Sequence, residues 1–247
     1  METTGQTADR PTGERSALVL FSGGQDSTTC LFWAKERFEE VEAIGFDYGQ
    51  KHRVELEQAE HIAEETAGVP FSVYDARGML EGASALTEHG KDLSADHELD
   101  EGLPASFVPG RNALFLSLAA ARGYRRETFD LVGGMCQTDY SGYPDCRRVF
   151  IDSMQASLSL ATGRDFRIHT PLMYLTKAET WKMAADLGIL EVVRRDTHTG
   201  YNGDRSELRE WGYGRPGNPA SKLRAEGYRE AKKRGWLASA DGGGDDG

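Results

Sequence analysis

The chain has 247 residues, with 40 acidic and 29 basic side chains and a formal net charge of −11. This length suits one large α/β domain with a small addition, and it is short for two full domains. The acidic balance argues against a broad polyanion-binding surface, so we expect no direct nucleic-acid partner. No apolar run reaches membrane-spanning length and segment 1–16 has no hydrophobic core, so we expect a cytoplasmic protein with no membrane partner. The three scattered cysteines, Cys30, Cys136 and Cys146, are expected to be reduced thiols.

Apolar runs alternate with helical patterns along most of the chain. The expected strands cover residues 17–21, 41–46, 69–74 and 129–132, and the expected helices cover 28–38, 54–66, 112–122, 148–160 and 176–187. The last of these opens with Thr176 and has Glu179 three positions later, the spacing of a capping box. The alternation predicts a doubly wound parallel α/β sheet, covered on both faces, with ligand sites at the carboxyl ends of its strands.

Composition suggests how the chain is divided. We expect disordered tails at 1–15 and 239–247, a main domain at 16–196 and a small helical C-terminal appendage at 197–238. The segment from 76 to 104 is rich in Gly, Asp, Glu and Ser and is longer than a usual connection, which makes it a candidate for a mobile lid.

A glycine-containing turn follows the first predicted strand, with the sequence Ser22-Gly23-Gly24-Gln25-Asp26-Ser27. A strand that turns through two glycines into a helix presents backbone amides and a positive dipole end, which suit a pyrophosphate. The turn lacks the Gly-Lys-Ser/Thr ending of a Walker loop and the spacing of a dinucleotide-binding loop. The competing interpretation is an ordinary strand-to-helix turn with polar caps.

This turn resembles the Ser-Gly-Gly-x-Asp-Ser loop of the PP-loop ATP pyrophosphatases, which activate a carbonyl or carboxylate by adenylation. The resemblance implies a Rossmann-like sheet of the adenine nucleotide alpha hydrolase type, with ATP and Mg²⁺ bound at the turn. Asp26 is the expected Mg²⁺ ligand, since a carboxylate can hold the metal on the leaving pyrophosphate. The implied nucleotide-binding residues are Leu20, Phe21, Ser22, Gly23, Gly24, Gln25, Asp26, Ser27 and Thr28.

Further polar segments fall where the predicted sheet places its strand ends. Asp47-Tyr48-Gly49-Gln50 closes the second strand, and Arg111 and Asn112 lie at a helix start, where backbone amides favour an anion. The segment from Asp139 to Arg147 could stack a flat heterocycle between tyrosines and bind its amino edge with carboxylates. Lys177 adds a cation near another helix start.

Taken together, these segments resemble the 7-cyano-7-deazaguanine synthase family, also called QueC or preQ₀ synthase. The resemblance extends from about Ala17 to Trp236. Its motifs are Phe21 to Cys30, Asp47 to Gln50, Val108 to Asn112, Asp139 to Arg147, Lys177 to Glu179 and Thr197 to Thr199. It implies ATP-dependent conversion of 7-carboxy-7-deazaguanine and ammonia into the nitrile, a precursor of queuosine or archaeosine in tRNA, by a homodimer.

The resemblance also implies roles for particular side chains. Asp26, Arg111 and Lys177 are the expected catalytic residues, because they hold the metal or neutralise charge on phosphate and carboxylate. The expected substrate contacts are Tyr48, Gln50, Asn112, Asp139, Tyr140, Tyr143, Asp145 and Arg147.

Each assignment has a plainer alternative. Arg111 could be a surface helix residue, Lys177 a solvated cation, and the tyrosines packing residues. His198 is a candidate general base, although an isolated histidine is more often structural. No cysteine is nominated as a nucleophile, because nothing nearby in the sequence indicates a lowered thiol pKa.

The chain departs from the family at its C-terminal end. Family members carry four cysteines there, in a spacing that suits a tetrahedral structural zinc. The matching residues in this chain are Gly200, Arg215, Asn218 and Ser221. We therefore expect no zinc, and we expect its loss to be offset locally by Trp211, Tyr213, two prolines and an Arg215 ion pair.

Other functions compete with the synthase hypothesis. A related enzyme could use the same ATP site to activate a different acid, or could couple a deazaguanine to a macromolecule. A tRNA-thiolating or lysidine-forming ligase would need a basic tRNA-binding extension or a reactive cysteine pair, and neither is seen. A non-catalytic nucleotide-binding module would tolerate the loss of Asp26 and Lys177, and both are present.

Overall fold

The fold was analysed in a computed structural model. It describes residues 15–49, 54–80, 96–97, 100–104, 107–138, 142–197, 206–214 and 219–237. Among these residues, no helix is both long enough and apolar enough to span a membrane.

Five parallel strands form the central sheet, in the order β3-β2-β1-β6-β7. The strands are β1 (Ser16–Leu20), β2 (Glu40–Asp47), β3 (Phe71–Asp75), β6 (Asp130–Val132) and β7 (Arg167–His169). Because β2 and β3 extend the sheet from one edge of β1 and β6 and β7 extend it from the other, the strand order reverses between β1 and β6. Open α/β sheets bind ligands at the carboxyl ends of the strands at such a point.

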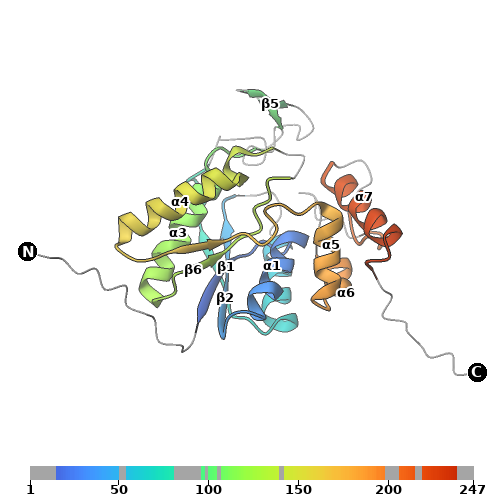
Figure 1. Cartoon of the computed structure of the whole chain (residues 1–247), viewed down its shortest axis with the longest axis horizontal. Coiled ribbons are helices and arrows are strands. Elements are labelled where there is room, and N and C mark those ends of the chain that lie inside the picture. Colours follow the sequence, from blue (N-terminus) through green and yellow to red (C-terminus); the bar gives the residue numbers. More distant parts are fainter. Residues whose placement is uncertain are drawn as a thin grey trace, which may run out of the picture.

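Helices cover both faces of this sheet, as predicted. The helices are α1 (Gln25–Lys35), α2 (Val54–Glu60, continued by π-helical turns at His61–Thr66), α3 (Arg111–Arg126), α4 (Arg148–Thr162), α5 (Lys177–Asp186), α6 (Leu190–Arg195) and α7 (Pro219–Lys233). Figure 1 shows α3 and α4 on one side of the sheet and α1 on the other. Side chains of β1 alternate between these faces, since Val19 packs with α1 and α2 whereas Leu18 packs with α3 and α4.

A third hydrophobic cluster lies beyond the sheet and joins α5, α6 and α7. Trp181 of α5, Val193 of α6 and Tyr228 of α7 are buried in it together with Trp211. In Figure 1, α7 lies beside α5, at the end of the molecule opposite α4. The core therefore continues without a break from the predicted main domain into the predicted appendage.

Strand β7 and helix α6 are among the regular elements that lie outside the predicted set. Strand β7 has three residues, of which only Ile168 is a buried apolar side chain, so it leaves no alternating pattern in the sequence. Helix α6 has six residues, fewer than the hydrophobic period needs to become visible. The expected helix at 54–66 is present, but its second half is π-helical.

The connection from 76 to 104 contains a short antiparallel pair, β4 (Asp96–His97) with β5 (Asp100–Pro104). Residues 81–95, 98–99 and 105–106 lie outside the described residues, so the mobile lid stays a prediction. The predicted tails also lie outside them, apart from Arg15, whose carbonyl accepts a hydrogen bond from the Glu39 amide at 2.9 Å.

Candidate active site

The turn between β1 and α1 lies at the carboxyl end of β1, where the strand order reverses. Gly23 has φ of +74°, which favours glycine, and a Cβ at this position would lie 3.1 Å from Ala59 of α2. Gly24 is the N-cap of α1 and makes no side-chain cap, so the first amides of the helix receive no capping group from it. The Ser27 hydroxyl donates to the Gly24 carbonyl and accepts from the Ser22 amide, both at 3.2 Å. An uncapped helix N-terminus of this kind suits an anionic ligand.

Several polar atoms of this turn and of the first helical turn are buried with no hydrogen-bond partner among the described residues. They are Nε2 of Gln25, Oδ1 of Asp26 and Oγ1 of Thr28. Buried polar groups normally have partners, so these atoms indicate a place for a bound polar molecule. The observation fits ATP and Mg²⁺, because a free carboxylate oxygen and backbone amides are the ligands that a metal-bound phosphate requires.

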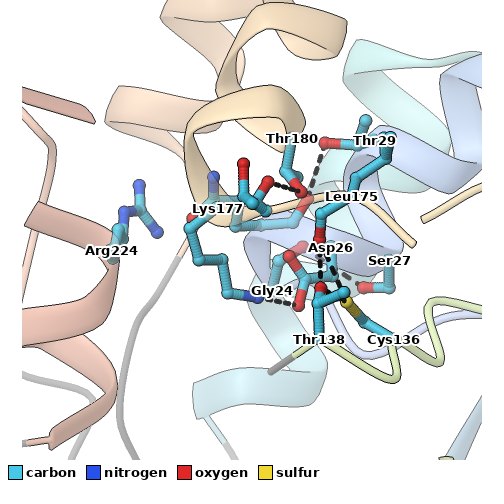
Figure 2. A network of polar contacts seen from close by, with 12 residues as sticks. Gly24, Asp26, Ser27, Thr29, Cys136, Thr138, Leu175, Lys177, Thr180 and Arg224 are labelled. Atoms are coloured by element: carbon cyan, nitrogen blue, oxygen red, sulfur yellow. Dashed lines mark hydrogen bonds and ion pairs between the residues drawn. The ribbon is translucent and has the colours of Figure 1, made fainter. Parts of the chain in front are cut away.

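An ion pair joins the turn to α5. Nζ of Lys177 lies 2.7 Å from Oδ2 of Asp26, and both side chains are largely shielded from solvent. Figure 2 shows the Lys177 side chain extending from the start of α5 to Asp26 at the start of α1. The structure thus brings together two predicted catalytic residues that lie 151 positions apart in the chain.

The segment after β6 completes this side of the site. A Cβ on Gly134 would lie 3.3 Å from Cβ of Asp26 and 3.4 Å from the Ser27 amide nitrogen, so the absence of a side chain at Gly134 eases the close approach of this segment to the turn. Thr138 Oγ1 donates to the Leu175 carbonyl, and Sγ of Cys136 donates to the same carbonyl at 3.4 Å (Figure 2). These bonds fasten the segment to the residues that lead into α5.

The predicted capping box at the start of α5 is present. The Glu179 amide donates to Oγ1 of Thr176 at 3.3 Å, and the Thr176 amide donates to the Glu179 carboxylate at 2.8 Å. The hydrogen bonds that the carboxylate accepts from the Thr176 amide and the Thr176 hydroxyl lower the pKa of Glu179 below its ordinary value. The box fixes where α5 begins, and hence where Lys177 leaves the backbone.

A second group of predicted residues lies at the start of α3. Oδ2 of Asp145 accepts a hydrogen bond from the Asn112 amide at 3.1 Å, and the Asn112 side-chain amide donates to the Asp145 carbonyl at 3.2 Å. The Asp145 side chain is buried and so caps the helix on which Arg111 and Asn112 lie. Arg147 is exposed at the N-cap of α4.

The predicted aromatic contacts lie near this second group. The Tyr143 ring packs on Phe107 with centroids 5.4 Å apart, and the Tyr48 ring packs on Phe115 at 5.6 Å. Both tyrosines are half-buried, so each ring packs on a neighbour and keeps part of its surface accessible. Gln50, Asp139 and Tyr140 lie outside the described residues, as does His198.

Two of the thiols near the site, Cys30 and Cys146, lack the character of a nucleophile. Burial raises the pKa of Cys30 well above its ordinary value, and the Asp26 charge acts in the same direction. Burial raises the pKa of Cys146 to about 12, with the Asp145 charge contributing. Cysteine reacts as the thiolate, so both are structural residues at neutral pH.

The positions that match the family's zinc ligands do not suit that metal. Ser221 is fully buried in α7, and its hydroxyl has no hydrogen-bond partner among the described residues. Gly200, Arg215 and Asn218 lie outside the described residues, and neither glycine nor arginine supplies the sulfur or imidazole ligands that structural zinc uses. Within the described part of the chain, no group of three or more His, Cys, Asp or Glu side chains could hold a metal ion.

Sequence reasoning missed the residues of α7 that pack against the start of α5, next to Lys177. Gly227 of α7 packs against the start of α5 and Arg224 lies one turn earlier on α7, and neither was given a role from the sequence. Gly227 did leave a signal, because an isolated glycine inside a helical pattern usually has a packing reason. Arg224 lies in the segment 222–228, which resembles the family, but it was given no role because a single arginine on an amphipathic helix is normally a surface residue.

Comparisons with known proteins find curated relatives that share one enzyme name. A curated relative from Rhodopseudomonas palustris (strain HaA2), named 7-cyano-7-deazaguanine synthase 1, is 47% identical over 91% of this chain and 98% of its own length. One from Sphingopyxis alaskensis, named 7-cyano-7-deazaguanine synthase 2, is 49% identical over 89% of this chain and 97% of its own length. One from Paracidovorax citrulli with the same enzyme name is 51% identical over 86% of this chain and 94% of its own length.

A solved structure described as the predicted subunit of a tRNA methyltransferase from Methanocaldococcus jannaschii has a TM-score of 0.48 and 19% identity, over 70% of this chain and 76% of that one. The family model described as "Queuosine biosynthesis protein QueC" matches residues 16–232. With that match and these identities over most of its length, the chain belongs to the QueC family.

Proposed function

We propose that this chain is an ATP-dependent carbon–nitrogen ligase that converts 7-carboxy-7-deazaguanine and ammonia into 7-cyano-7-deazaguanine. Curated relatives that bear this enzyme name, at 47 to 51% identity over most of the chain, support the assignment. The structural observation that carries it is the Lys177–Asp26 ion pair at an uncapped helix N-terminus, where the strand order reverses. Membership of the family places the product upstream of queuosine.

ATP binds at the turn between β1 and α1 in this proposal. The backbone amides of the uncapped first turn of α1 and the hydroxyls of Ser22 and Ser27 bind phosphate oxygens. Asp26 Oδ1, buried and without a partner among the described residues, is available to hold Mg²⁺. The metal would supply charge neutralisation on the departing phosphate oxygens.

Lys177 neutralises negative charge as the phosphorus is attacked. Its Nζ already lies 2.7 Å from Asp26, so the ammonium group is held beside the phosphate site before ATP arrives. A cation held in place stabilises developing charge without having to reorganise. Arg111, at the start of α3, is the second cation of the proposed site and acts on the carboxylate of the acid.

The deazaguanine binds on the side of the site formed by the start of α3. The half-buried Tyr48 and Tyr143 rings offer flat surfaces for a heterocycle, and Gln50, Asn112, Asp139, Tyr140 and Arg147 are the proposed polar and stacking contacts. For Asp145 we propose a positioning role. Its carboxylate already accepts a hydrogen bond from the Asn112 amide, and it thereby positions Asn112 and Arg111.

Activation by ATP makes each bond change feasible. A carboxylate resists ammonia because its charge repels nucleophiles and oxide is a poor leaving group. The carboxylate oxygen attacks a phosphorus atom of ATP, and the phosphate groups beyond that atom leave. The product is a mixed anhydride of the acid and the nucleotide. Ammonia then displaces the nucleotide phosphate and loses a proton to give the amide. A second activation, at the amide oxygen, lets that oxygen leave with phosphorus while the nitrogen loses two protons to form the nitrile.

Zinc has no part in this proposal. The C-terminal residues are held by buried rings and by hydrogen bonds of Arg224, and the residues at the family's zinc positions do not fit that metal.

We also propose a homodimer in the cytoplasm. The family resemblance supports the dimer, and the outer face of α4 offers exposed apolar side chains at Val149 and Leu160 for an interface.

The assignment is tested by incubating the protein with ATP, Mg²⁺, ¹⁵N-ammonium and 7-carboxy-7-deazaguanine, followed by mass spectrometry of the base. We expect first the amide and then the nitrile, each containing one ¹⁵N atom. Lys177→Met keeps the hydrocarbon part of the side chain and removes its charge, so the rate should fall by about 10²–10³-fold. A folded wild-type protein that forms neither product would overturn the assignment.

A further inference from the structure

Gly227 lies in the middle of α7, against the first residue of α5. A Cβ at this position would lie 2.6 Å from Cβ of Lys177, 2.8 Å from its carbonyl carbon and 3.1 Å from the Ala178 amide nitrogen. Non-bonded carbon atoms do not approach so closely, so the two helices can pack here only because Gly227 has no side chain. Glycine is unfavourable inside a helix, and this contact explains its presence.

Helix α7 is itself firmly held. Arg224, one turn before Gly227, is fully buried and donates hydrogen bonds to the Trp211 carbonyl at 2.9 Å, the Thr197 hydroxyl at 2.8 Å and the Val193 carbonyl at 2.6 Å. These bonds tie α7 to the end of α6 and to the residues around 211.

A second set of contacts ties α7 directly to α5. Nε1 of Trp181 donates to the Arg224 carbonyl at 3.1 Å, and the Trp181 ring meets Tyr228 edge to face at 5.1 Å. A cavity of about 200 Å³ borders the same contact and is lined by Thr138, Lys177, Gly227 and Glu230, among others. The middle of α7 therefore faces the side of the site on which Lys177 lies.

We propose that α7 is a positioning element of the phosphate site, in which Gly227 sets the backbone at Lys177 and thereby the approach of its ammonium group to Asp26. The inference rests on the proposed function, because it takes Lys177 as the residue that neutralises phosphate charge. Gly227 touches neither substrate nor reacting atoms in this proposal. It acts through Lys177, since the backbone at residue 177 is the part of the site that α7 touches.

A double-mutant cycle of Gly227→Ala with Lys177→Met tests this. Methionine keeps the Cβ that a residue at 227 would meet, so the steric overlap persists in both backgrounds while the ammonium group is present in only one. In the wild-type background we expect Gly227→Ala to lower kcat by about tenfold or more, because small misplacements of a catalytic group are costly. In the Lys177→Met background, Gly227→Ala should lower kcat by less than about twofold. It should lower the melting temperature by the same amount in both backgrounds.

Gly123→Ala is the matched control. Its Cβ would lie 2.3 Å from the Thr128 carbonyl oxygen, at the end of α3 away from Asn112, so it introduces an overlap of similar severity outside the site. We expect it to lower the melting temperature and to leave kcat within about twofold at a temperature where the protein is folded. An unchanged kcat in Gly227→Ala, or an equal loss in both backgrounds, overturns the inference.

Calorimetric titration with Mg²⁺-ATP keeps the two proposals separate. If the wild type makes neither amide nor nitrile, the assigned reaction is wrong. The double-mutant cycle can still be carried out with the affinity for Mg²⁺-ATP as the measured quantity. A loss of affinity in Gly227→Ala that disappears in the Lys177→Met background then supports positioning by α7. Equal losses in both backgrounds overturn it.

Discussion

At the residue scale, Asp145 makes a contact in the structure that its surroundings in the sequence do not indicate. The acidic and aromatic segment around it led to the expectation of contact with the amino edge of a heterocycle. In the structure its carboxylate is buried and accepts from the Asn112 amide. Sequence gave no sign of this bond, because the two residues are 33 positions apart and no local pattern connects them.

Asn and Ala substitutions at Asp145 separate the two roles. Asp145→Asn keeps an oxygen that can accept from the Asn112 amide, so the free energy of unfolding should change little. Asp145→Ala removes the cap and should lower it by about 1 kcal/mol, measured by urea denaturation. If Asp145 only positions the helix, Asp145→Asn keeps the KM for the acid near the wild-type value. A large rise in KM for Asp145→Asn, without loss of stability, would instead support direct contact with the base.

Asp26 and Lys177 were both named from their motifs, and the structure joins them by an ion pair. The pairing itself was beyond sequence reasoning, because it depends on α5 returning to the carboxyl end of β1. Residue type and helix position could be predicted here, whereas the contact between them could not.

At the scale of elements, segments with a clear run or period of apolar side chains were predicted, including the short strand β6, whereas β7 and α6 were not. Helices α3 and α4 and strand β2 lie close to their expected bounds, since each has a regular pattern of buried apolar side chains. Strand β7 was missed because its pairing with β6 defines it as a strand, through main-chain bonds that any sequence can make. The π-helical turns at His61–Thr66 were missed for a similar reason, since a 3.6-residue period does not reveal a local widening of the helix.

The attachment of α7 through Arg224 yields a prediction about stability. Arg224 donates to two carbonyls and a hydroxyl while fully buried, and this burial lowers its pKa to about 9. Arg224→Leu removes these bonds and leaves buried oxygen atoms without a donor, so it should lower the free energy of unfolding by about 3 kcal/mol. Thermal unfolding followed by circular dichroism measures this loss.

A zinc chelator provides the comparison. Because the residues at the family's zinc positions do not fit that metal, treatment with the chelator should leave the melting temperature of the wild type unchanged. Elemental analysis should find less than one zinc per chain. One tightly bound zinc per chain, or a large fall in melting temperature with chelator, would contradict this account of the C-terminal residues.

At the scale of the whole molecule, two partly buried carboxylates make opposite contributions to the dependence of stability on pH. Burial raises the pKa of Glu55 to about 7. Burial also acts to raise the pKa of Glu42, but hydrogen bonds and charges from Arg122 and Arg126 bring it below the ordinary value. Glu42 therefore adds stability above its unfolded-state pKa, and this contribution is lost in acid. Glu55 binds a proton more readily in the native state, so its contribution falls as pH rises from about 4.5 to about 7.

Glu55→Gln tests the second contribution. The substitution removes a carboxylate whose ionisation is penalised by burial, so it should stabilise the protein above pH 7 and have little effect near pH 4. The expected gain at pH 8 is on the order of 2 kcal/mol, because Glu55 is only half-buried. Urea denaturation of both proteins from pH 4 to pH 8 measures the difference. A difference that does not grow over this range would show that Glu55 ionises as freely in the folded state as in the unfolded chain.

The order of the strands has a consequence for synthesis on the ribosome. Strand β1 is the first strand to leave the ribosome. It lies at the centre of the sheet and pairs with β6 as well as with β2. A nascent chain that ends before residue 177 holds the glycine turn but lacks the lysine that faces Asp26, and one that ends before 219 lacks the helix behind that lysine. Under the proposed function, the ATP site is therefore completed only when the last part of the chain has been translated.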